Sequence, residues 1–267
     1  MNGSNKDFLW LNISTLPYFR GLLRAVESRV YENLDLPEPS FDLGCGDGHF
    51  SSVAFNKKVT VGLDPWTGPV QLARKNGKYD LVVQGNGETI PFPDGFFSCA
   101  VSNSVLEHIP DLDPVLKELA RVLKPEAPFI FCVPNNNFLD NLSISNWLDR
   151  IGIHWLAKRY RSFFNSISRH HHCDSRVIWE ERLAKQGFVI EDHWDYFSPE
   201  ALGALEWGHY FGLPSLICHF FFRIWILVPA RWNLAITMRL IRKFYLEADR
   251  QPVGSYSFYF THKIASE

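Results

Sequence analysis

The sequence Phe-Asp-Leu-Gly-Cys-Gly-Asp-Gly at residues 41–48 decides the fold that we expect for this chain. A short apolar strand runs into this segment, and a helical pattern follows it to about Asn56. Three glycines lie in the turn between them, at Gly44, Gly46 and Gly48, where side chains would keep a ligand away from the backbone. A strand, a glycine-rich turn and a helix in this order predict a nucleotide-binding loop.

The spacing of the glycines distinguishes a dinucleotide-binding loop from a loop that binds another nucleoside cofactor. Dinucleotide-binding enzymes use the pattern G-x-G-x-x-G, with two residues between the second and third glycines. His49 stands where the third glycine of that pattern would be, and Gly48 comes one residue early. The loop therefore favours a different nucleoside cofactor.

Short apolar runs alternate with helical patterns around this loop, as in parallel βαβ units. We expect helices at 16–34, 48–56, 70–75, 113–123 and from 174 or 175 to 186. The expected strands are one ending at residue 43 and those at 59–63, 81–84, 97–102, 129–133, 188–196 and 255–262. The predicted fold class is α/β, a Rossmann-like doubly wound sheet of seven strands. A helical, aromatic-rich insertion lies between the last two strands.

Composition excludes several classes of partner and compartment. The 27 basic residues nearly balance the 29 acidic ones, and no basic tract is present, so we expect no nucleic-acid partner. The 5 cysteines form no CxxC pair, which favours a reducing compartment. The first twelve residues lack the pattern of a signal peptide. We therefore expect a cytoplasmic protein, with contact at a membrane surface left open.

Polar residues and glycines follow the next three expected strands. Asp64 and Pro65 end the second strand, where a carboxylate can accept both ribose hydroxyls of a nucleoside. Asn86 and Gly87 follow the third strand, and a polar side chain beside exposed backbone suits the amino edge of adenine. Asn103 follows the fourth strand. Parallel strands present their ligands at their carboxyl ends, so these residues are expected to meet at one edge of the sheet.

These segments, in this order, resemble the class I S-adenosylmethionine-dependent methyltransferases, close to the branch that contains the ubiquinone and menaquinone C-methyltransferases. The resemblance covers residues 41–135 most strongly. It implies S-adenosylmethionine as the cofactor and S-adenosylhomocysteine as the product. It also implies a set of cofactor-binding residues, namely Asp42, Gly44, Cys45, Gly46, Gly48, Asp64, Pro65, Asn86, Gly87 and Asn103.

Each part of that set has an implied partner on the cofactor. Asp42 and the glycine loop would hold the methionine moiety, Asp64 the ribose, Asn86 and Gly87 the adenine, and Asn103 would lie beside the sulfonium. The family usually has Asp where Asn86 stands, but an amide carbonyl still accepts a hydrogen bond. It also favours Asp where Ser98 stands, a structural position.

We expect the chain to divide into four segments. Residues 1–40 would form an N-terminal helical cap, and 41–197 the core that binds the cofactor. Residues 198–250 would be a helical insertion acting as a substrate lid, and 251–267 the final strand of the core sheet.

Candidate catalytic residues follow the fourth strand. His108 can take a proton near neutral pH, and Glu107 stands beside it. The alternative is that His108 caps the following turn. In the N-terminal helix, Tyr18 is expected to line the substrate site, whereas Arg20 pairs with a ligand carboxylate or forms an ordinary ion pair.

The run His-His-His-Cys-Asp at residues 170–174 suggests metal binding at first sight. Consecutive side chains rarely point the same way, and zinc sites need a separated second pair of ligands, which the sequence does not show. We therefore expect no metal, and a loop that leads into a helix.

The segment 211–229 is the most hydrophobic of the chain, but Pro214, His219 and Arg223 interrupt it, so a bilayer-spanning helix is not expected. Three interpretations stay open: a core helix pair, a lid over an apolar pocket, or an interfacial anchor with neighbouring arginines toward lipid headgroups. His209 and Tyr210 lie just before this segment and are expected to contact the substrate.

The predicted function is methyl transfer to a small, hydrophobic acceptor, on oxygen or carbon. Two alternatives are a cofactor-binding enzyme of the same fold with non-methylating chemistry, and methylation of a sugar or other polar metabolite. A scaffolding protein without turnover is a third, which the intact glycine loop disfavours. The sequence leaves open the acceptor, the need for a general base and the oligomeric state.

Overall fold

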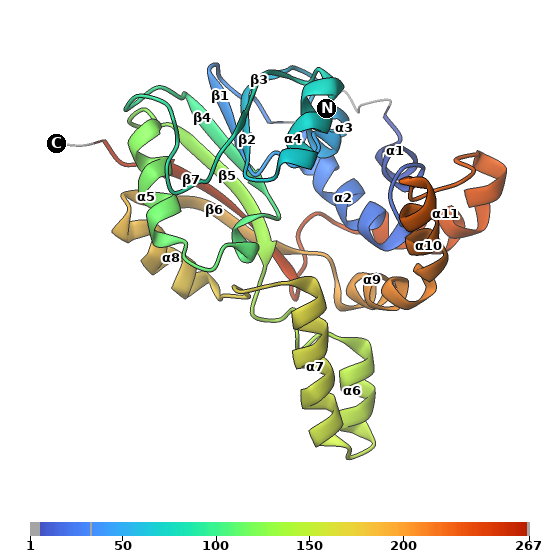
Figure 1. Ribbon diagram of the computed structural model, residues 1–267. Helices are drawn as coiled ribbons and strands as arrows, with labels where there is room; N and C mark the ends of the chain where they lie inside the picture. The colour runs from blue at the N-terminus through green and yellow to red at the C-terminus, as the bar shows by residue number, and fades with distance from the viewer. Residues whose placement is uncertain (1–5, 33, 266–267) are drawn as a thin grey trace.

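The computed structural model describes residues 6–32 and 34–265, and within them it shows one sheet of seven strands (Figure 1). The strands are β1 (Ser40–Leu43), β2 (Val59–Asp64), β3 (Tyr79–Gln84), β4 (Cys99–Asn103), β5 (Pro128–Pro134), β6 (Phe188–Tyr196) and β7 (Tyr256–Lys263). Their order is β3-β2-β1-β4-β5-β7-β6, and β7 runs antiparallel to both of its neighbours. The predicted α/β fold with a Rossmann-like sheet is confirmed.

The helices that follow the sequence pattern are α2 (Tyr18–Tyr31), α3 (His49–Ala54), α4 (Thr67–Asn76), α5 (Asp113–Val122) and α8 (Arg176–Lys185), with a short 3₁₀ helix, η1 (Leu106–His108). The insertion between β6 and β7 is helical as predicted and contains α9 (Pro199–Phe211), α10 (Leu213–Phe222) and α11 (Arg231–Tyr245). Residues 1–5 and 33 of the predicted cap, and 266–267 of the predicted final segment, lie outside the described residues.

Three helices lie where the sequence analysis expected none: α1 (Phe8–Ile13), α6 (Ser143–Arg150) and α7 (His154–Ser168). Helices α6 and α7 form a hairpin that extends away from the sheet (Figure 1). Along α7 only Ala157 and Phe164 are buried, and Trp155 and Phe163 are exposed. Apolar residues therefore lie on both the buried and the exposed sides of α7. Hydrophobic periodicity predicts a helix only where apolar residues keep to one face, so it did not predict this one.

The sheet separates two hydrophobic cores because strand side chains alternate between its faces. In β5, Phe129 and Phe131 join the core beneath α5 and α8, whereas Ile130 and Cys132 join the core on the opposite face. That second core also contains residues of α1, α2, α9 and α11. The N-terminal helices and the insertion therefore cover the same face of the sheet.

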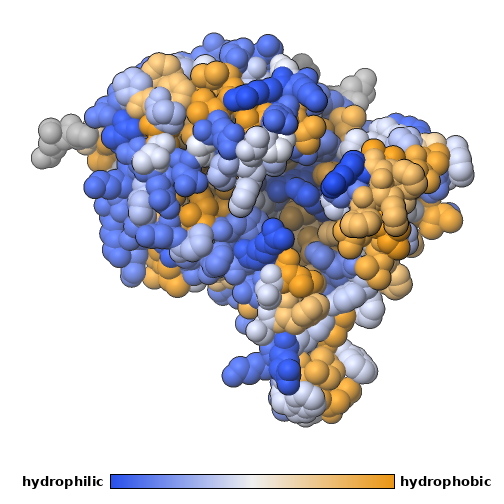
Figure 2. All heavy atoms as spheres, in the orientation of Figure 1, coloured by the Kyte–Doolittle hydropathy of each residue, from blue (hydrophilic) through white to orange (hydrophobic). Residues whose placement is uncertain are grey.

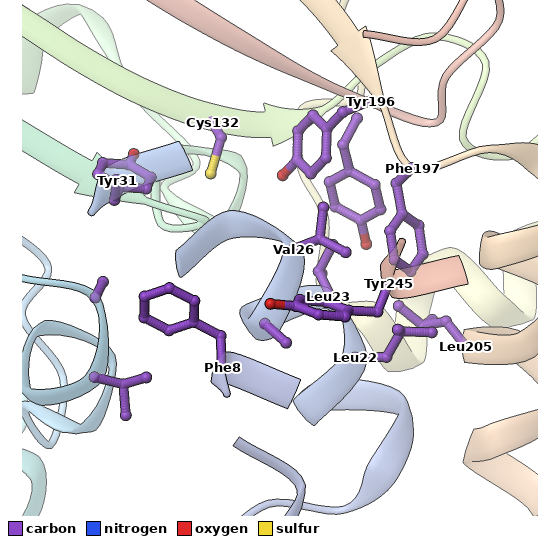
Figure 3. Close-up of a cluster of buried hydrophobic side chains, with 14 of the residues drawn as sticks. Phe8, Leu22, Leu23, Val26, Tyr31, Cys132, Tyr196, Phe197, Leu205 and Tyr245 are labelled. Atoms are coloured by element: carbon purple, nitrogen blue, oxygen red, sulfur yellow. The ribbon is translucent and has the colours of Figure 1, made fainter. Parts of the chain in front are cut away.

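Helix α2 lies at the centre of this second core. Leu22, Leu23 and Val26 are buried in the cluster that Phe8 of α1 and Leu205 of α9 share (Figure 3). The carboxyl ends of β4 and β5 lie beside this cluster, because Cys132 belongs to it (Figure 3). Because the apolar face of α2 is buried in this cluster, the helix is held beside the carboxyl ends of the parallel strands, where a ligand is expected.

Candidate active site

A cavity of about 540 Å³ opens at the carboxyl ends of β1, β2, β3 and β4. Its walls come from the loops after these strands and from α2, as expected for a ligand site in an open parallel sheet. Nine predicted cofactor residues line it, namely Asp42, Gly44, Cys45, Gly46, Asp64, Pro65, Asn86, Gly87 and Asn103. Folding therefore brings to one cavity residues that the sequence spreads over 62 positions, from 42 to 103.

The three loop glycines have different physical reasons to be glycine. All have positive φ, at +82° for Gly44, +55° for Gly46 and +74° for Gly48. A Cβ on Gly46 would meet nothing within 4 Å, so this residue leaves open space for a ligand. A Cβ on Gly44 would lie 2.4 Å from Val105, and one on Gly48 would lie 3.2 Å from the backbone of Ala73.

The sequence argument assigned ligand approach to all three glycines, and that assignment stays a prediction; open space for a Cβ is present only at Gly46 of the three. Gly44 lines the cavity but is confined by the loop after β4, whereas Gly48 does not line the cavity and packs against α4. The tight turn itself, and not the ligand alone, requires these two glycines.

Asp64 is held rigidly beside the loop. One carboxylate oxygen accepts the backbone N–H of Gly46 at 3.0 Å, and the other accepts the N–H of Trp66 at 2.9 Å. The residue is 7% exposed, and burial raises the pKa of its carboxyl. Each oxygen has a second lone-pair direction left for a ligand hydroxyl, which suits the predicted ribose contact.

Asp42 is anchored from beneath the cavity. Its Oδ2 accepts hydrogen bonds from the hydroxyls of Ser51, at 2.8 Å, and Tyr79, at 2.5 Å. Burial raises the pKa of Asp42 to about 6, although these two hydroxyls act in the opposite direction. The predicted contact of Asp42 with the methionine moiety would therefore use Oδ1, and it stays a prediction.

Asn103 is oriented by a buried carboxylate that the sequence analysis did not identify. Glu27 of α2 is 0% exposed, and its Oε2 accepts from Arg24 and Asn103, both at 2.8 Å. Its Oε1 accepts from the hydroxyls of Ser104, at 3.0 Å, and Tyr196, at 2.9 Å. One carboxylate thus ties α2 to the loop after β4 and to the end of β6.

Helix α2 also supplies two cations to the cavity. Arg20 and Arg24, one turn apart on the helix, both line it. The sequence analysis named Arg20 and missed Arg24. The spacing of four and three residues between Arg20, Arg24 and Glu27 would have indicated it, because residues at this spacing share one face of a helix, here the face opposite the apolar one. Tyr18 does not line the cavity.

His108 lines the cavity in a defined tautomer. Its Nδ1 lies 3.0 Å from the carbonyl oxygen of Arg169, and because a carbonyl only accepts, Nδ1 carries the proton. The lone pair is therefore on Nε2. Partial burial lowers the pKa of this imidazole, which keeps it neutral at pH 7.

Glu107 is buried and does not itself line the cavity that its neighbour lines. The residue is 1% exposed, and burial raises its pKa to about 8. The two side chains of the predicted catalytic pair therefore have different surroundings, because η1 turns consecutive residues in different directions. Their catalytic roles stay predictions.

His209 and Tyr210 of α9 lie outside the cavity, together with Tyr18. The His209 ring packs on Phe19 with centroids 4.2 Å apart, and its Nδ1 donates to the carbonyl of Leu205. The hydroxyl of Tyr210 lies 2.9 Å from that of Tyr160 in α7. The structure therefore does not bring these three predicted substrate residues to the cavity. Helix α9 directs His209 and Tyr210 toward neighbouring helices, and the ring of Tyr18 in α2 lies beside Gly208 of α9.

Residues 41–131 match the family model described as a methyltransferase domain. This chain contains a methyltransferase domain. The match agrees with the methyltransferase family predicted from the glycine loop. The methyltransferase domain ends within β5, so the α6–α7 hairpin and the insertion lie beyond the matched residues.

Curated relatives match only part of the chain. The malonyl-[acyl-carrier protein] O-methyltransferase of Yersinia pestis is 34% identical over 103 residues, which cover 38% of this chain and 38% of that protein. The ubiquinone/menaquinone biosynthesis C-methyltransferase of Pasteurella multocida is 38% identical over 61 residues, 23% of each chain. The chain therefore matches less than half of the length of these curated relatives.

Among solved structures, the chain is similar to the geranyl diphosphate C-methyltransferase of Streptomyces coelicolor A3(2). The TM-score is 0.54 at 16% identity, over 93% of this chain and 84% of that one. This similarity extends beyond the methyltransferase domain and concerns the fold alone.

Proposed function

We propose that this protein transfers a methyl group from S-adenosylmethionine to a small, apolar acceptor. The observation that carries the proposal is the single cavity that gathers the glycine loop, Asp64, Asn86 with Gly87, and Asn103 at the carboxyl ends of four parallel strands. A volume of about 540 Å³ is in the range of small-molecule and cofactor sites.

The residues present fit the proposed cofactor. Gly46 leaves open space at the loop, where a side chain would otherwise stand, and the Asp64 carboxylate is already fixed for two ribose hydroxyls. Arg20 and Arg24 are the cations that would pair with the carboxylate of the methionine moiety. When bound, the cofactor supplies a methyl carbon that its sulfonium already makes electrophilic.

The chain has to align the acceptor with that methyl group and exclude water. Apolar side chains also line the cavity, among them Leu16, Phe50, Ile109, Pro110 and Val115. They favour an acceptor with an apolar body. The Pasteurella protein is named for ubiquinone/menaquinone biosynthesis and the Streptomyces protein for geranyl diphosphate, which is consistent with this acceptor class.

Labelled methyl transfer tests the acceptor class directly. We expect label from S-adenosylmethionine to enter prenylated quinones, phenols or prenyl phosphates in preference to sugars. Preferential labelling of sugars would contradict the apolar acceptor.

Asp64→Ala is expected to weaken S-adenosylhomocysteine binding by about 1–3 kcal/mol, which is about 5- to 150-fold in Kd, because charge-assisted hydrogen bonds are lost. Calorimetry of the purified protein measures it. Asp80→Ala is the control, because Asp80 lies on neighbouring β3, pairs with Lys58 at 3.8 Å and is well exposed. Absence of binding by the unmodified protein would overturn the proposal.

The insertion supports the further proposal that the protein docks on an anionic membrane surface to reach such an acceptor. Helix α10 has no buried residue, and Phe220, Phe221 and Phe222 are 74%, 69% and 61% exposed. On α11, Trp232, Ile236 and Leu240 are spaced by four residues and are all exposed. Apolar residues gather over this part of the surface (Figure 2).

The charges around this apolar surface complement anionic lipid. Between residues 207 and 246 the sequence contains no Asp or Glu. The same stretch contains the five basic residues Arg223, Arg231, Arg239, Arg242 and Lys243. An apolar face with flanking cations is the arrangement of interfacial helices. No helix among residues 6–32 and 34–265 is long and apolar enough to cross a bilayer.

We expect the protein to float with phosphatidylglycerol vesicles and to bind less to phosphatidylcholine vesicles. A variant with Ser at Phe220, Phe221 and Phe222 should lose this binding. The matched control carries Ser at Trp147, Trp155 and Phe163, which are also exposed but lie on the α6–α7 hairpin. Equal loss of binding in both variants would contradict docking through α10.

A further inference from the structure

The loop after β4 and the segment after α7 meet beside the cavity, although about 60 residues separate them in sequence. The backbone N–H of His171 donates to the carbonyl of Glu107 at 2.7 Å. Nδ1 of His108 donates to the carbonyl of Arg169 at 3.0 Å, and Nε2 of His172 donates to that of Ile109 at 3.0 Å. With a weaker bond from the backbone N–H of His172 to the carbonyl of Glu107, at 3.3 Å, these hydrogen bonds fasten the two segments to each other.

Three ligand-type side chains meet at this junction. Glu107, His108 and His170 each place a ligand atom within 4.8 Å of those of the other two. Nε2 of His108 lies 3.9 Å from Oε1 of Glu107, and the rings of His108 and His170 lie 5.4 Å apart. The second pair of ligands that the histidine run seemed to lack is therefore Glu107 and His108.

Glu107 lacks compensation for its burial within the part of the chain that the structure describes. Its side chain is 1% exposed, and Oε2 has no hydrogen-bond partner there. A buried carboxylate oxygen without a partner is costly, and such groups are commonly paired or coordinate a metal. Glu107 thus points independently to a ligand at this junction.

His108 also has the arrangement of a metal ligand. Ligating histidines commonly donate the second ring N–H to a backbone carbonyl, which fixes the tautomer and the ring orientation. His108 does so through Nδ1, and its Nε2 is directed to Glu107. The ring of His170 is held by Phe138, in a T-shaped contact with centroids 4.9 Å apart.

We propose that Glu107, His108 and His170 bind one divalent transition-metal cation, such as Zn²⁺ or Fe²⁺, at the acceptor side of the cavity. Two imidazoles and one carboxylate are a ligand set of catalytic zinc and of non-haem iron, and both leave coordination positions open. Donor atoms around tetrahedral zinc lie about 3.3 Å apart, so small side-chain rotations close the site from its present spacing.

This inference rests on the proposed methyl transfer and specifies its acceptor as an oxygen nucleophile. His108 lines the cavity, so an open position of the ion is accessible to the acceptor. The bound ion would acidify a coordinated acceptor hydroxyl, whose proton would go to water. The acceptor oxygen would then bond to the methyl carbon as the carbon–sulfur bond breaks and its electron pair goes to sulfur.

The test measures Zn²⁺ and Co²⁺ binding to chelator-treated protein, by calorimetry and by the visible spectrum of bound Co²⁺. We expect one ion per chain, and a loss of affinity of about 100-fold or more in His170→Ala and Glu107→Gln. His171→Ala is the matched control, because His171 is exposed, adjacent in sequence and outside the cluster. It should bind the ion as the unmodified protein does.

Each outcome decides the inference. Binding of less than one ion per chain, unchanged affinity in both ligand variants, or equal loss in His171→Ala would overturn it. S-adenosylhomocysteine binding, measured without metal, shows that each variant is folded and tests the proposed function separately. A protein that binds this nucleoside but no ion would retain the methyltransferase proposal and lose the metal site.

Discussion

Glu27→Ala is expected to lower the free energy of unfolding by about 3–5 kcal/mol, because it removes one partner of a buried ion pair. Glu27 is fully buried and accepts hydrogen bonds from Arg24, Asn103, Ser104 and Tyr196. In the variant, these donors and the Cys132 thiol lose this acceptor at once, and the Arg24 guanidinium loses its counter-charge. Urea denaturation followed by circular dichroism measures the change.

Two further variants identify the cause of that loss. Asp80→Ala removes an exposed pair with Lys58 and should change stability by less than about 1 kcal/mol. Glu27→Gln keeps an acceptor oxygen and removes the charge, so its loss of unfolding free energy should lie between those of Glu27→Ala and Asp80→Ala. If Glu27→Ala lowered the free energy of unfolding as little as Asp80→Ala, the Glu27 carboxylate would not be what holds α2 in place.

Gly44→Ala is expected to cost about 2–4 kcal/mol of stability, from a close contact and a positive φ together. The new Cβ would lie 2.4 Å and 2.5 Å from the two γ carbons of Val105, at a φ of +82°. Either the glycine loop or the loop after β4 must move. Thermal and urea unfolding measure the loss, and calorimetry with S-adenosylhomocysteine measures its effect on the cavity.

Gly46→Ala is the matched comparison, because its Cβ would meet no protein atom within 4 Å. It should cost only about 1 kcal/mol of stability, from its positive φ, yet weaken S-adenosylhomocysteine binding. Val105→Ala should partly relieve Gly44→Ala in a double-mutant cycle, since it removes the two nearest atoms. Equal stability losses at Gly44 and Gly46 would contradict the different roles assigned to them.

The meeting of nine predicted cofactor residues at one cavity was predictable from the sequence because these residues lie at or just beyond strand ends. Parallel pairing places the carboxyl ends of β1, β2, β3 and β4 together, so residues just beyond each strand must meet. Asp64 and Asn86 needed only correct strand positions to be placed. Local pattern also identified α2, through its apolar face.

The acceptor side depends on packing between segments that are distant in sequence. His209 and Tyr210 were expected at the substrate site, but α9 packs against α2 and turns them elsewhere. Glu107 and His108 are adjacent in sequence, yet one is buried and the other lines the cavity. Periodicity describes one element at a time, so it contains no information on these orientations.

The sequence by itself therefore determined the methyltransferase domain, the α/β sheet and most of the cofactor loop, because backbone conformation and strand order are encoded locally. Only the tertiary structure decided why each loop glycine is needed, where Glu27 acts and that His170 lies beside Glu107. The physical reason is that these contacts form between side chains from different elements. Which side chains meet depends on which faces of α2, α7 and α9 are buried, and not on the spacing of residues along the chain.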